Sequence, residues 1–128
     1  MLAQEVISVS KFKQAATHDE KVALKTTLEA LRPFKSLRDT MPLQYVTAFL
    51  HVALEEGLTV SEYAKRAGTS QSLMTRHLAD LGETNRYHTQ GFGLIEQFDN
   101  VMDRRERLIR LTAKGRHVVY EMAQAHKR

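Results

Sequence analysis

Apolar residues recur at helical spacing in several stretches of the chain, and each stretch has a start or stop signal beside it. In the first, leucines follow one another at three- and four-residue intervals between Thr17 and Pro33. Thr17 and Glu20 have the spacing of a capping box, and Pro33 is expected to close the helix, so the pattern predicts a helix over residues 17–32. The preceding residues, 1–16, fit either a short helix or an irregular arm.

Two further helices are predicted by similar signals. Pro42 opens the second helix and Gly57 stops it, because proline is favoured at a helix start and glycine just past a helix end. Its inner face is expected to contain Leu43, Val46, Leu50, Ala53 and Leu54. The third helix begins with a capping box, Thr59 and Glu62, and ends at Gly68. Its buried stripe is expected to contain Val60, Tyr63, Ala64 and Ala67.

The second half of the chain changes from helical spacing to strand-like alternation and back. Ser70 caps a fourth helix that ends at Gly82, with Met74, Leu78 and Leu81 on its inner face. Residues 82–92 have no periodicity and predict a loop. The segments "GLIEQF" (93–98) and "RERLIRL" (105–111) flank a polar tip and predict a two-stranded ribbon. Thr112 then caps a final helix whose inner face is expected to contain Val118, Val119 and Met122.

Composition restricts what this mainly α arrangement with one β-hairpin can be. The 128 residues suit one domain, and no cysteine is present for disulfides or thiolate metal sites. The N-terminal stretch is interrupted by Glu5 and does not resemble a signal peptide. No run approaches the ~20 apolar residues of a membrane span. We therefore expect a cytoplasmic protein without a membrane partner.

The excess charge is concentrated in a short part of the chain. The net charge is +4, and residues 103–117 alone carry six basic and two acidic residues, so the remainder is neutral overall. A basic cluster of this kind indicates an anionic partner. The alternative is a solvated strand edge that discourages aggregation.

Residues 59–81, "TVSEYAKRAGTSQSLMTRHLADL", have the pattern of a helix-turn-helix. Ala64 is small where the two helices must approach closely, and Gly68 supplies the turn. On the second helix, the face opposite the apolar residues carries side chains that reach DNA base edges: Gln71, Ser72, Thr75 and Arg76. The alternative is an ordinary helical hairpin with a solvated outer face.

The segment "GLIEQFDNVMDRRERLIRLTAKG" resembles the wing of MarR-type regulators. That wing has a G-L-V strand, a D-x-R tip, a hydrophobic return strand and an L-T-x-x-G helix start. The matching positions are Gly93, Leu94, Ile95, Asp103, Arg105, Leu111, Thr112 and Gly115. With the helix-turn-helix, the resemblance covers about residues 43–122, and it implies a winged helix-turn-helix.

The resemblance also implies how DNA is bound. The recognition helix would enter the major groove, and Arg105 would enter the adjacent minor groove. Asp103 would pair with a nearby arginine and shape the tip. Arg104, Arg107 and Arg110 would contact phosphates or flank the ribbon. The candidate DNA-binding residues are therefore Ser70, Gln71, Ser72, Thr75, Arg76, Arg104, Arg105 and Arg107.

The sequence departs from the family pattern at three places. Thr69 stands where an aliphatic turn residue is usual. Eleven residues, 82–92, replace about three between recognition helix and wing. They either touch the DNA backbone, through Arg86, Tyr87, His88 and Gln90, or merely lengthen a tolerant loop. Only thirteen residues follow Gly115, which shortens the C-terminal helix that such dimers use.

Other site chemistries find little support. Six histidines show no metal-ligand spacing, so we expect no metal site. No phosphate loop, nucleophile elbow or metalloprotease motif occurs, so we expect neither a cofactor nor enzymatic activity. A small-molecule effector is compatible with the resemblance, but no pocket residues are recognisable.

These observations predict a sequence-specific double-stranded DNA-binding transcriptional regulator, with repression as the expected mode. The alternatives are an origin-binding or architectural DNA-binding protein of a plasmid or phage, and a winged helix used for protein interaction. Residues 1–41 are expected to form an arm and a dimerisation helix, 42–112 the DNA-binding region, and 113–128 a C-terminal helix of the same domain.

A homodimer is expected because one winged helix contacts few base pairs. The expected interface combines Leu24, Leu28 and Leu31 with Val118, Val119 and Met122. The alternative is that both stripes complete the core of the monomer.

Overall fold

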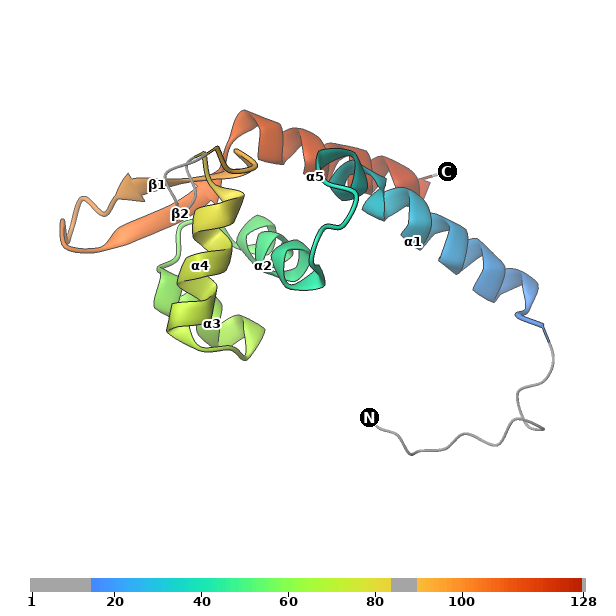
Figure 1. The fold of residues 1–128 in the computed structure, drawn as a ribbon, viewed down its shortest axis with the longest axis horizontal. Coiled ribbons are helices and arrows are strands. Elements are labelled where there is room, and N and C mark those ends of the chain that lie inside the picture. The colour runs from blue at the N-terminus through green and yellow to red at the C-terminus, as the bar shows by residue number, and fades with distance from the viewer. Residues whose placement is uncertain (1–14, 84–89, 128) are drawn as a thin grey trace.

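The structure is a computed structural model that describes residues 15–83 and 90–127. Its elements are α1 (His18–Leu37), α2 (Leu43–Leu54), α3 (Val60–Ala67), α4 (Gln71–Leu81), β1 (Ile95–Asp99), β2 (Arg107–Leu111) and α5 (Ala113–Lys127). This order confirms the predicted arrangement. In Figure 1, α1 and α5 lie side by side at one end, and the hairpin projects at the other end beside α4.

The predicted helix starts are present. Thr17 accepts a hydrogen bond from the backbone N–H of Glu20, whose carboxylate accepts one from the backbone N–H of Thr17. Thr59 and Glu62 form the same box at α3. These boxes satisfy backbone donors that the first turn of a helix leaves unpaired.

The turn between α3 and α4 forms as the sequence predicts. Gly68 ends α3 with a φ of 68°, in the left-handed region where glycine avoids the steric cost of a side chain. Two residues later, Ser70 caps α4 by accepting from the N–H of Leu73. The two helices are therefore joined as a tight helix-turn-helix.

The predicted end of the first helix is wrong. Pro33 lies inside α1, which continues to Leu37. Continuation buries Phe34, which is 2% exposed and packs edge-on against Phe49 of α2 with ring centroids 5.5 Å apart. The burial of this large aromatic side chain offsets the cost of a proline within a helix, about 3 kcal/mol.

The predicted inner face of the second helix is also wrong in part. Leu43 and Leu54 are 70% and 82% exposed. The buried residues of α2 are Val46, Ala48, Phe49 and Val52. This helix is apolar on most sides, and its contacts with α3, α4 and β2 decide which side is buried. Pro42 is the N-cap residue rather than the first helical residue, and the helix ends at Leu54, before Gly57.

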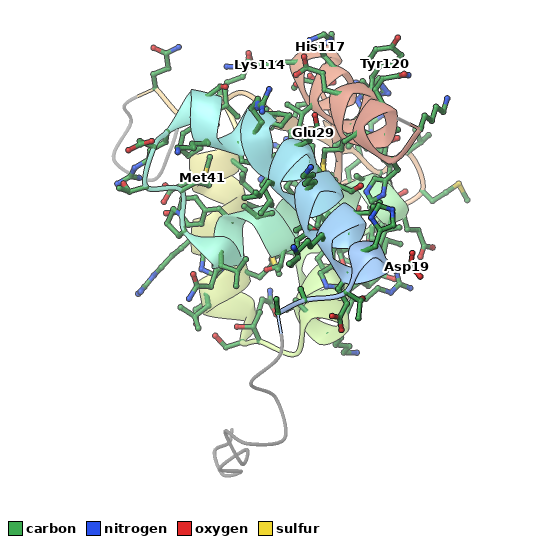
Figure 2. All side chains as sticks on the ribbon, turned by 90° about the vertical axis from the view of Figure 1, so that its right-hand side faces the viewer. Asp19, Glu29, Met41, Lys114, His117 and Tyr120 are labelled. Carbon is green, nitrogen blue, oxygen red and sulfur yellow. The ribbon has the colours of Figure 1, made fainter. Side chains whose placement is uncertain are left out.

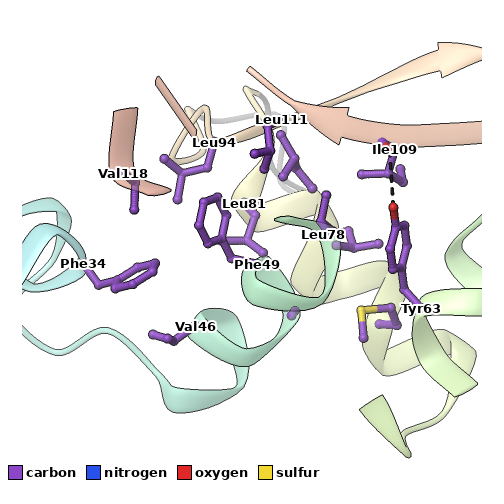
Figure 3. Close-up of a cluster of buried hydrophobic side chains, with 14 of the residues drawn as sticks. Phe34, Val46, Phe49, Tyr63, Leu78, Leu81, Leu94, Ile109, Leu111 and Val118 are labelled. Carbon is purple, nitrogen blue, oxygen red and sulfur yellow. Dashed lines mark hydrogen bonds between the residues drawn. The ribbon is translucent and has the colours of Figure 1, made fainter. Parts of the chain in front are cut away.

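One hydrophobic core joins the helices to the base of the hairpin (Figure 3). The largest fully buried side chains come from every element except β1 and α5: Phe34, Phe49, Val52, Tyr63, Met74, Leu81, Leu94 and Ile109, with Leu94 just before β1. α5 contributes Val118, which is buried, and Val119 and Met122, which are partly buried. The hairpin is thus anchored in the core at one end.

The hairpin is antiparallel, with Ile95 opposite Leu111 and Asp99 opposite Arg107. The strands begin about two residues later than the sequence pattern predicts. Leu58 forms an additional antiparallel bridge with Ile109, so the segment between α2 and α3 pairs with β2.

The junction between hairpin and α5 requires a glycine. Thr112 accepts from the N–H of Gly115 and donates to the carbonyl of Gly93, at 3.0 and 2.6 Å. A Cβ on Gly115 would lie 2.1 Å from the carbonyl oxygen of Leu94. The L-T-x-x-G motif therefore has a steric basis: only glycine permits this close approach.

The ends of the expected 82–92 loop are joined by backbone hydrogen bonds. Gly93 donates to Gly82 at 2.9 Å, and Gly91 donates to Glu83 at 2.8 Å. Residues 82–83 and 91–93, at the two ends of this segment, therefore lie together next to the end of α4. The proposed backbone contacts of residues 86–88 lie outside the described residues, and Gln90 is exposed.

Candidate nucleic-acid interface

The outer face of α4 carries the predicted polar residues. Gln71, Ser72, Thr75 and Arg76 are all exposed. Met74 and Leu78, on the opposite side, are 1% and 4% exposed. Because its apolar side packs against α2 and α3, the helix presents this polar side to solvent in a fixed orientation.

Two of the predicted hydroxyl groups, those of Ser70 and Thr75, form hydrogen bonds with the backbone of α4. Ser70 Oγ accepts from the N–H of Leu73 at 3.1 Å, which makes it the N-cap. Thr75 Oγ1 donates to the carbonyl of Gln71 at 2.8 Å and keeps its lone pairs for a donor. Within residues 15–83 and 90–127, Arg76 forms no ion pair.

We define the wing as residues 95–111. The side chain of Tyr63 holds the base of this wing in place. Its hydroxyl donates to the carbonyl of Glu55 at 2.8 Å, accepts from the N–H of Leu58 at 3.3 Å and lies 3.4 Å from the carbonyl oxygen of Ile109 (Figure 3). Burial raises the pKa of Tyr63 above its usual value. The sequence identified Tyr63 as a core residue but did not indicate this polar role.

Glu56 provides a second attachment of the wing. Its Oε1 accepts from the backbone N–H of Leu111 at 2.8 Å and lies 3.6 Å from Nη2 of Arg116. A side chain between α2 and α3 thereby fixes the end of β2 and the start of α5. No sequence signal pointed to Glu56, because its partners are more than fifty residues away.

Asp80, near the end of α4, is buried and makes a contact that the sequence did not indicate. It is 9% exposed, and its carboxylate accepts a hydrogen bond from the hydroxyl of Tyr45 on α2. The ring of Tyr45 also contacts His77 and Phe92. These contacts fix the end of α4 against α2 and against the segment that leads into the wing.

The wing tip consists of two consecutive turns. The N–H of Asp103 donates to the carbonyl of Asn100 at 3.2 Å, and the N–H of Glu106 donates to the carbonyl of Asp103 at 3.0 Å. Residues 101 and 102 are the corners of the first turn, and residues 104 and 105 are the corners of the second. The first pair is apolar, Val-Met, and the second is basic, Arg-Arg.

Asp103 shapes the basic turn, as the resemblance implied. Its Oδ1 accepts from the backbone N–H of Arg105 at 3.0 Å and lies 3.2 Å from Nε of the same residue. The side chain of Arg105 is 92% exposed. In the part of the chain that the structure describes, Arg104 has no ion-pair partner. Both guanidinium groups are therefore presented to solvent.

The rest of the wing is less basic than its arginine content indicates. Residues 95–111 contain four arginines and four carboxylates. Arg107 lies 3.3 Å from Asp99, and Arg110 lies 2.8 Å from Glu96 across the strands. β1 supplies acidic partners for the arginines of β2. The excess positive charge that the sequence predicted along the whole ribbon is therefore confined to the second turn of the tip.

α4 and the wing are neighbours separated by a hollow. The hollow has a volume of about 460 Å³ and is lined by Leu78 and Ala79 of α4 and by Glu96, Gln97 and Ile109 of the wing. The structure thus brings the predicted residues to two adjacent elements, and the β1–β2 hairpin extends past α4, away from the other helices (Figure 1).

At the other end of the molecule, α1 leaves an apolar stripe uncovered. Leu24, Leu28 and Leu31 are 58%, 70% and 39% exposed. Figure 2 shows this end, with α1 in front and α5 beside it. The α1 leucines therefore do not complete the core of the single chain. The expected stripe on α5 does: Val118 is part of that core, and Val119 and Met122 pack against it, so for α5 the alternative reading holds.

Two site types are not found in the ranges 15–83 and 90–127. No cluster of three histidine, aspartate or glutamate side chains there is arranged to hold a metal ion. None of the helices in those ranges has both the length and the hydrophobicity needed to cross a membrane.

Comparison with solved structures identifies the fold. The chain is similar to the transcriptional regulator Tm0710 from Thermotoga maritima, with a TM-score of 0.64, 16% identity, and coverage of 84% of this chain and 68% of that one. It is similar to a mutant of S. aureus MepR bound to an oligodeoxyribonucleotide, with a TM-score of 0.61, 19% identity, and coverage of 94% and 78%. A third similar structure is the MarR family transcription regulator SP03579, with a TM-score of 0.58, 18% identity, and coverage of 93% and 72%.

The sequence matches no protein-family model and no curated protein. The structural likeness nevertheless confirms the winged helix-turn-helix fold of MarR-type regulators, which the wing segment predicted.

Proposed function

We propose that this chain is a sequence-specific double-stranded DNA-binding transcriptional regulator that represses by occupying its site. The observation that carries the proposal is the exposed polar face of α4, held beside a wing that ends in two exposed arginines. The oligodeoxyribonucleotide bound by the similar MepR structure supports DNA as the partner. A protein with this role acts in the cytoplasm beside its DNA and has no catalytic step.

In this proposal the two elements have different tasks. α4 lies in the major groove, where Arg76 and Gln71 reach guanine and adenine edges, and Ser72 and Thr75 contact bases or phosphates. Ser70 fixes the start of the helix by capping it. Arg104 and Arg105 enter the minor groove, where negative potential is enhanced when the groove is narrow. Arg107, which also forms an ion pair with Asp99, contacts phosphate.

Selection of duplexes tests this function. The purified chain is incubated with a pool of random-sequence duplexes, and the retained fraction is sequenced over several rounds. We expect one enriched sequence and an affinity that falls steeply with salt, because phosphate contacts release counterions. A protein-interaction module would instead enrich no sequence, and that result would refute the proposal.

Arg105→Ala sharpens the same test. It should weaken binding most when the selected site has an A·T-rich flank, because minor-groove width depends on sequence there. Arg38→Ala is the matched control, since Arg38 is exposed and caps α1 only through its backbone N–H. Equal effects of the two substitutions would contradict a specific role of the wing tip.

The proposal includes a homodimer formed through the exposed leucine stripe of α1. A symmetric dimer doubles the contacted base pairs and implies two half-sites about one helical turn apart. The exposed stripe of Leu24, Leu28 and Leu31 supports this role, since a second copy would cover it. Sedimentation equilibrium should show a dimer, and Leu28→Asp should give a monomer that retains its helical content. A monomeric wild-type protein at micromolar concentration would refute the dimer while leaving DNA binding open to the selection experiment.

A further inference from the structure

The first turn of the wing tip exposes two apolar side chains. Val101 and Met102 are 87% and 90% exposed, more than any other large apolar side chain in residues 15–83 and 90–127. Turn corners are normally occupied by Gly, Pro, Asn, Asp or Ser, and a β-branched valine is unfavourable there. Local conformational preference therefore does not explain these residues, and neither belongs to the hydrophobic core of the described residues.

The apolar turn is held in one shape by Asn100. Its Oδ1 accepts from the backbone N–H of Met102 at 3.0 Å, and its Nδ2 donates to the carboxylate of Glu106 at 2.9 Å. The backbone N–H of Asn100 also donates to the carbonyl of Glu106 at 3.3 Å. The tip thus presents Val101 and Met102 on an ordered scaffold rather than on a loose loop.

The position of Val101 and Met102 relative to the arginines indicates which surface they contact. The apolar turn adjoins the basic turn directly, because Asp103 ends the first and begins the second. If Arg105 enters the minor groove, Val101 and Met102 lie at the same groove. A phosphate would be a poor contact for them, whereas the sugar walls and base edges of the groove offer apolar surface.

The charge balance of the wing also supports an apolar contact with the minor groove. Residues 95–111 have equal numbers of arginines and carboxylates, so the hairpin as a whole has no net charge, and its attraction to phosphate is limited to contacts of individual arginines such as Arg107. Burial of apolar side chains can hold a hairpin without net charge against the duplex. Side chains such as methionine act in this way in other minor-groove proteins, where they enter between base steps and kink the duplex.

We propose that Val101 and Met102 form an apolar wedge that enters the minor groove beside Arg105 and bends the DNA. This inference rests on the proposed function and adds a specificity determinant to it. Since pyrimidine–purine steps such as TA and CA unstack most easily, the wedge favours such a step at the position that the tip reaches. The chain thereby discriminates between sequences at bases that receive no hydrogen bond from the wing.

The test uses the full chain and a duplex that the wild type has enriched from the random pool. The double variant Val101→Ser with Met102→Ser removes the wedge, and Met102→Leu keeps an apolar side chain. Leu54→Ser is the matched control, because Leu54 is 82% exposed on α2, away from the tip. Affinity is measured by titration, and bending by energy transfer between dyes at the two ends of the duplex. Thermal unfolding of each variant confirms that its fold is retained.

We expect the double variant to bind about tenfold more weakly, since burial of a methionine side chain corresponds to roughly a power of ten in a binding constant. It should also lose the bend and the preference for a pyrimidine–purine step. Met102→Leu should retain most of the bend, and Leu54→Ser should bind as the wild type does.

The outcomes separate this inference from the proposed function. Wild-type affinity and bending in the double variant would overturn the wedge and leave DNA binding intact. Weaker binding with an unchanged bend would also overturn it, since the pair would then only touch the groove. If the wild type enriches no duplex at all, the proposed function fails, and the wedge fails with it.

Discussion

α4 and the wing are positioned by different kinds of interaction. α4 packs Met74, Leu78 and Leu81 into the core, so its orientation depends on apolar burial along the whole helix. The wing is buried only at its base, where the polar contacts of Glu56 and Tyr63 attach it to the α2–α3 segment. Beyond that base, hydrogen bonds within the hairpin and its tip maintain its shape.

This difference indicates which perturbations each element tolerates. An interface built on a packed helix resists the loss of one polar contact, because many apolar contacts hold it. A projecting hairpin has few apolar contacts to spare, so a single carboxylate at its base has a large share in its position. We therefore expect α4 to respond to cavities and the wing to respond to the removal of hydrogen-bond partners.

The largest expected effect is that of Met74→Ala. Met74 is 1% exposed between α3 and α4, and its truncation should lower the free energy of unfolding by about 2–5 kcal/mol. Leu73→Ala, one residue away and 45% exposed, should cost less than about 1 kcal/mol. Urea denaturation measures both. Similar losses for the two variants would show that α4 is not oriented by its apolar face.

Glu56→Ala tests the attachment of the wing. It leaves the N–H of Leu111 without its acceptor and should cost about 1–3 kcal/mol in the free energy of unfolding. The amide of Leu111 should also exchange its hydrogen faster. Glu56→Gln should retain most of the stability because an amide oxygen still accepts. Glu55→Ala is the control: Glu55 pairs with Arg66 on the surface, and its loss should cost about 0–1 kcal/mol.

Arg76→Ala tests whether α4 reads bases while the strands of the wing contact phosphate. It should weaken binding to the selected duplex by about 1–3 kcal/mol and relax the preference at one base position. Arg107→Ala should weaken binding to selected and random duplexes alike and lower the salt slope by about one unit. Titrations on both duplexes decide. If Arg76→Ala weakened binding to selected and random duplexes equally, Arg76 would contact phosphate and would not read a base.

The smallest expected effect concerns the helix that braces α4. Hydrogen bonds from the backbone and side chain of Thr59 lower the pKa of Glu62 below its usual value of 4.5. A carboxylate whose pKa is depressed by folding stabilises the protein above its unfolded-state pKa, and this stabilisation is lost as the pH falls through the folded-state pKa. The stability difference between wild type and Glu62→Gln should therefore be constant at neutral pH and shrink below about pH 4.5. Urea denaturation at a series of pH values measures it, and a difference that does not change with pH would contradict the assignment.

Several features of the site could be predicted because their cause lies within a few residues. The capping boxes at Thr17 and Thr59, the turn at Gly68 and the cap at Ser70 each depend on one short segment. The polar face of α4 and the pairing of Asp103 with an arginine also follow from local spacing or from the resemblance to a known wing. The roles of the predicted DNA-binding residues remain predictions that the binding experiments above address.

Other features could not be predicted because their cause lies elsewhere in the chain. Pro33 is a local stop signal, but the burial of Phe34 against α2 outweighs it. α2 is apolar on several sides, so its sequence alone does not show that Phe49 is buried and Leu54 exposed. The ion pairs of Arg107 and Arg110 were missed because their acidic partners precede them on the other strand.

The sequence by itself thus determined the order of the elements, the helix caps, the helix-turn-helix and the hairpin, since each depends on short-range hydrogen bonds and periodic apolar burial. Only the tertiary structure decided how the wing is attached, where its charge is presented and which leucines remain uncovered. The contacts of Glu56 with Leu111 and of Tyr63 with Glu55 arise when distant segments meet. Their energies depend on packing geometry and not on neighbours in the sequence, and for that reason no local pattern encodes them.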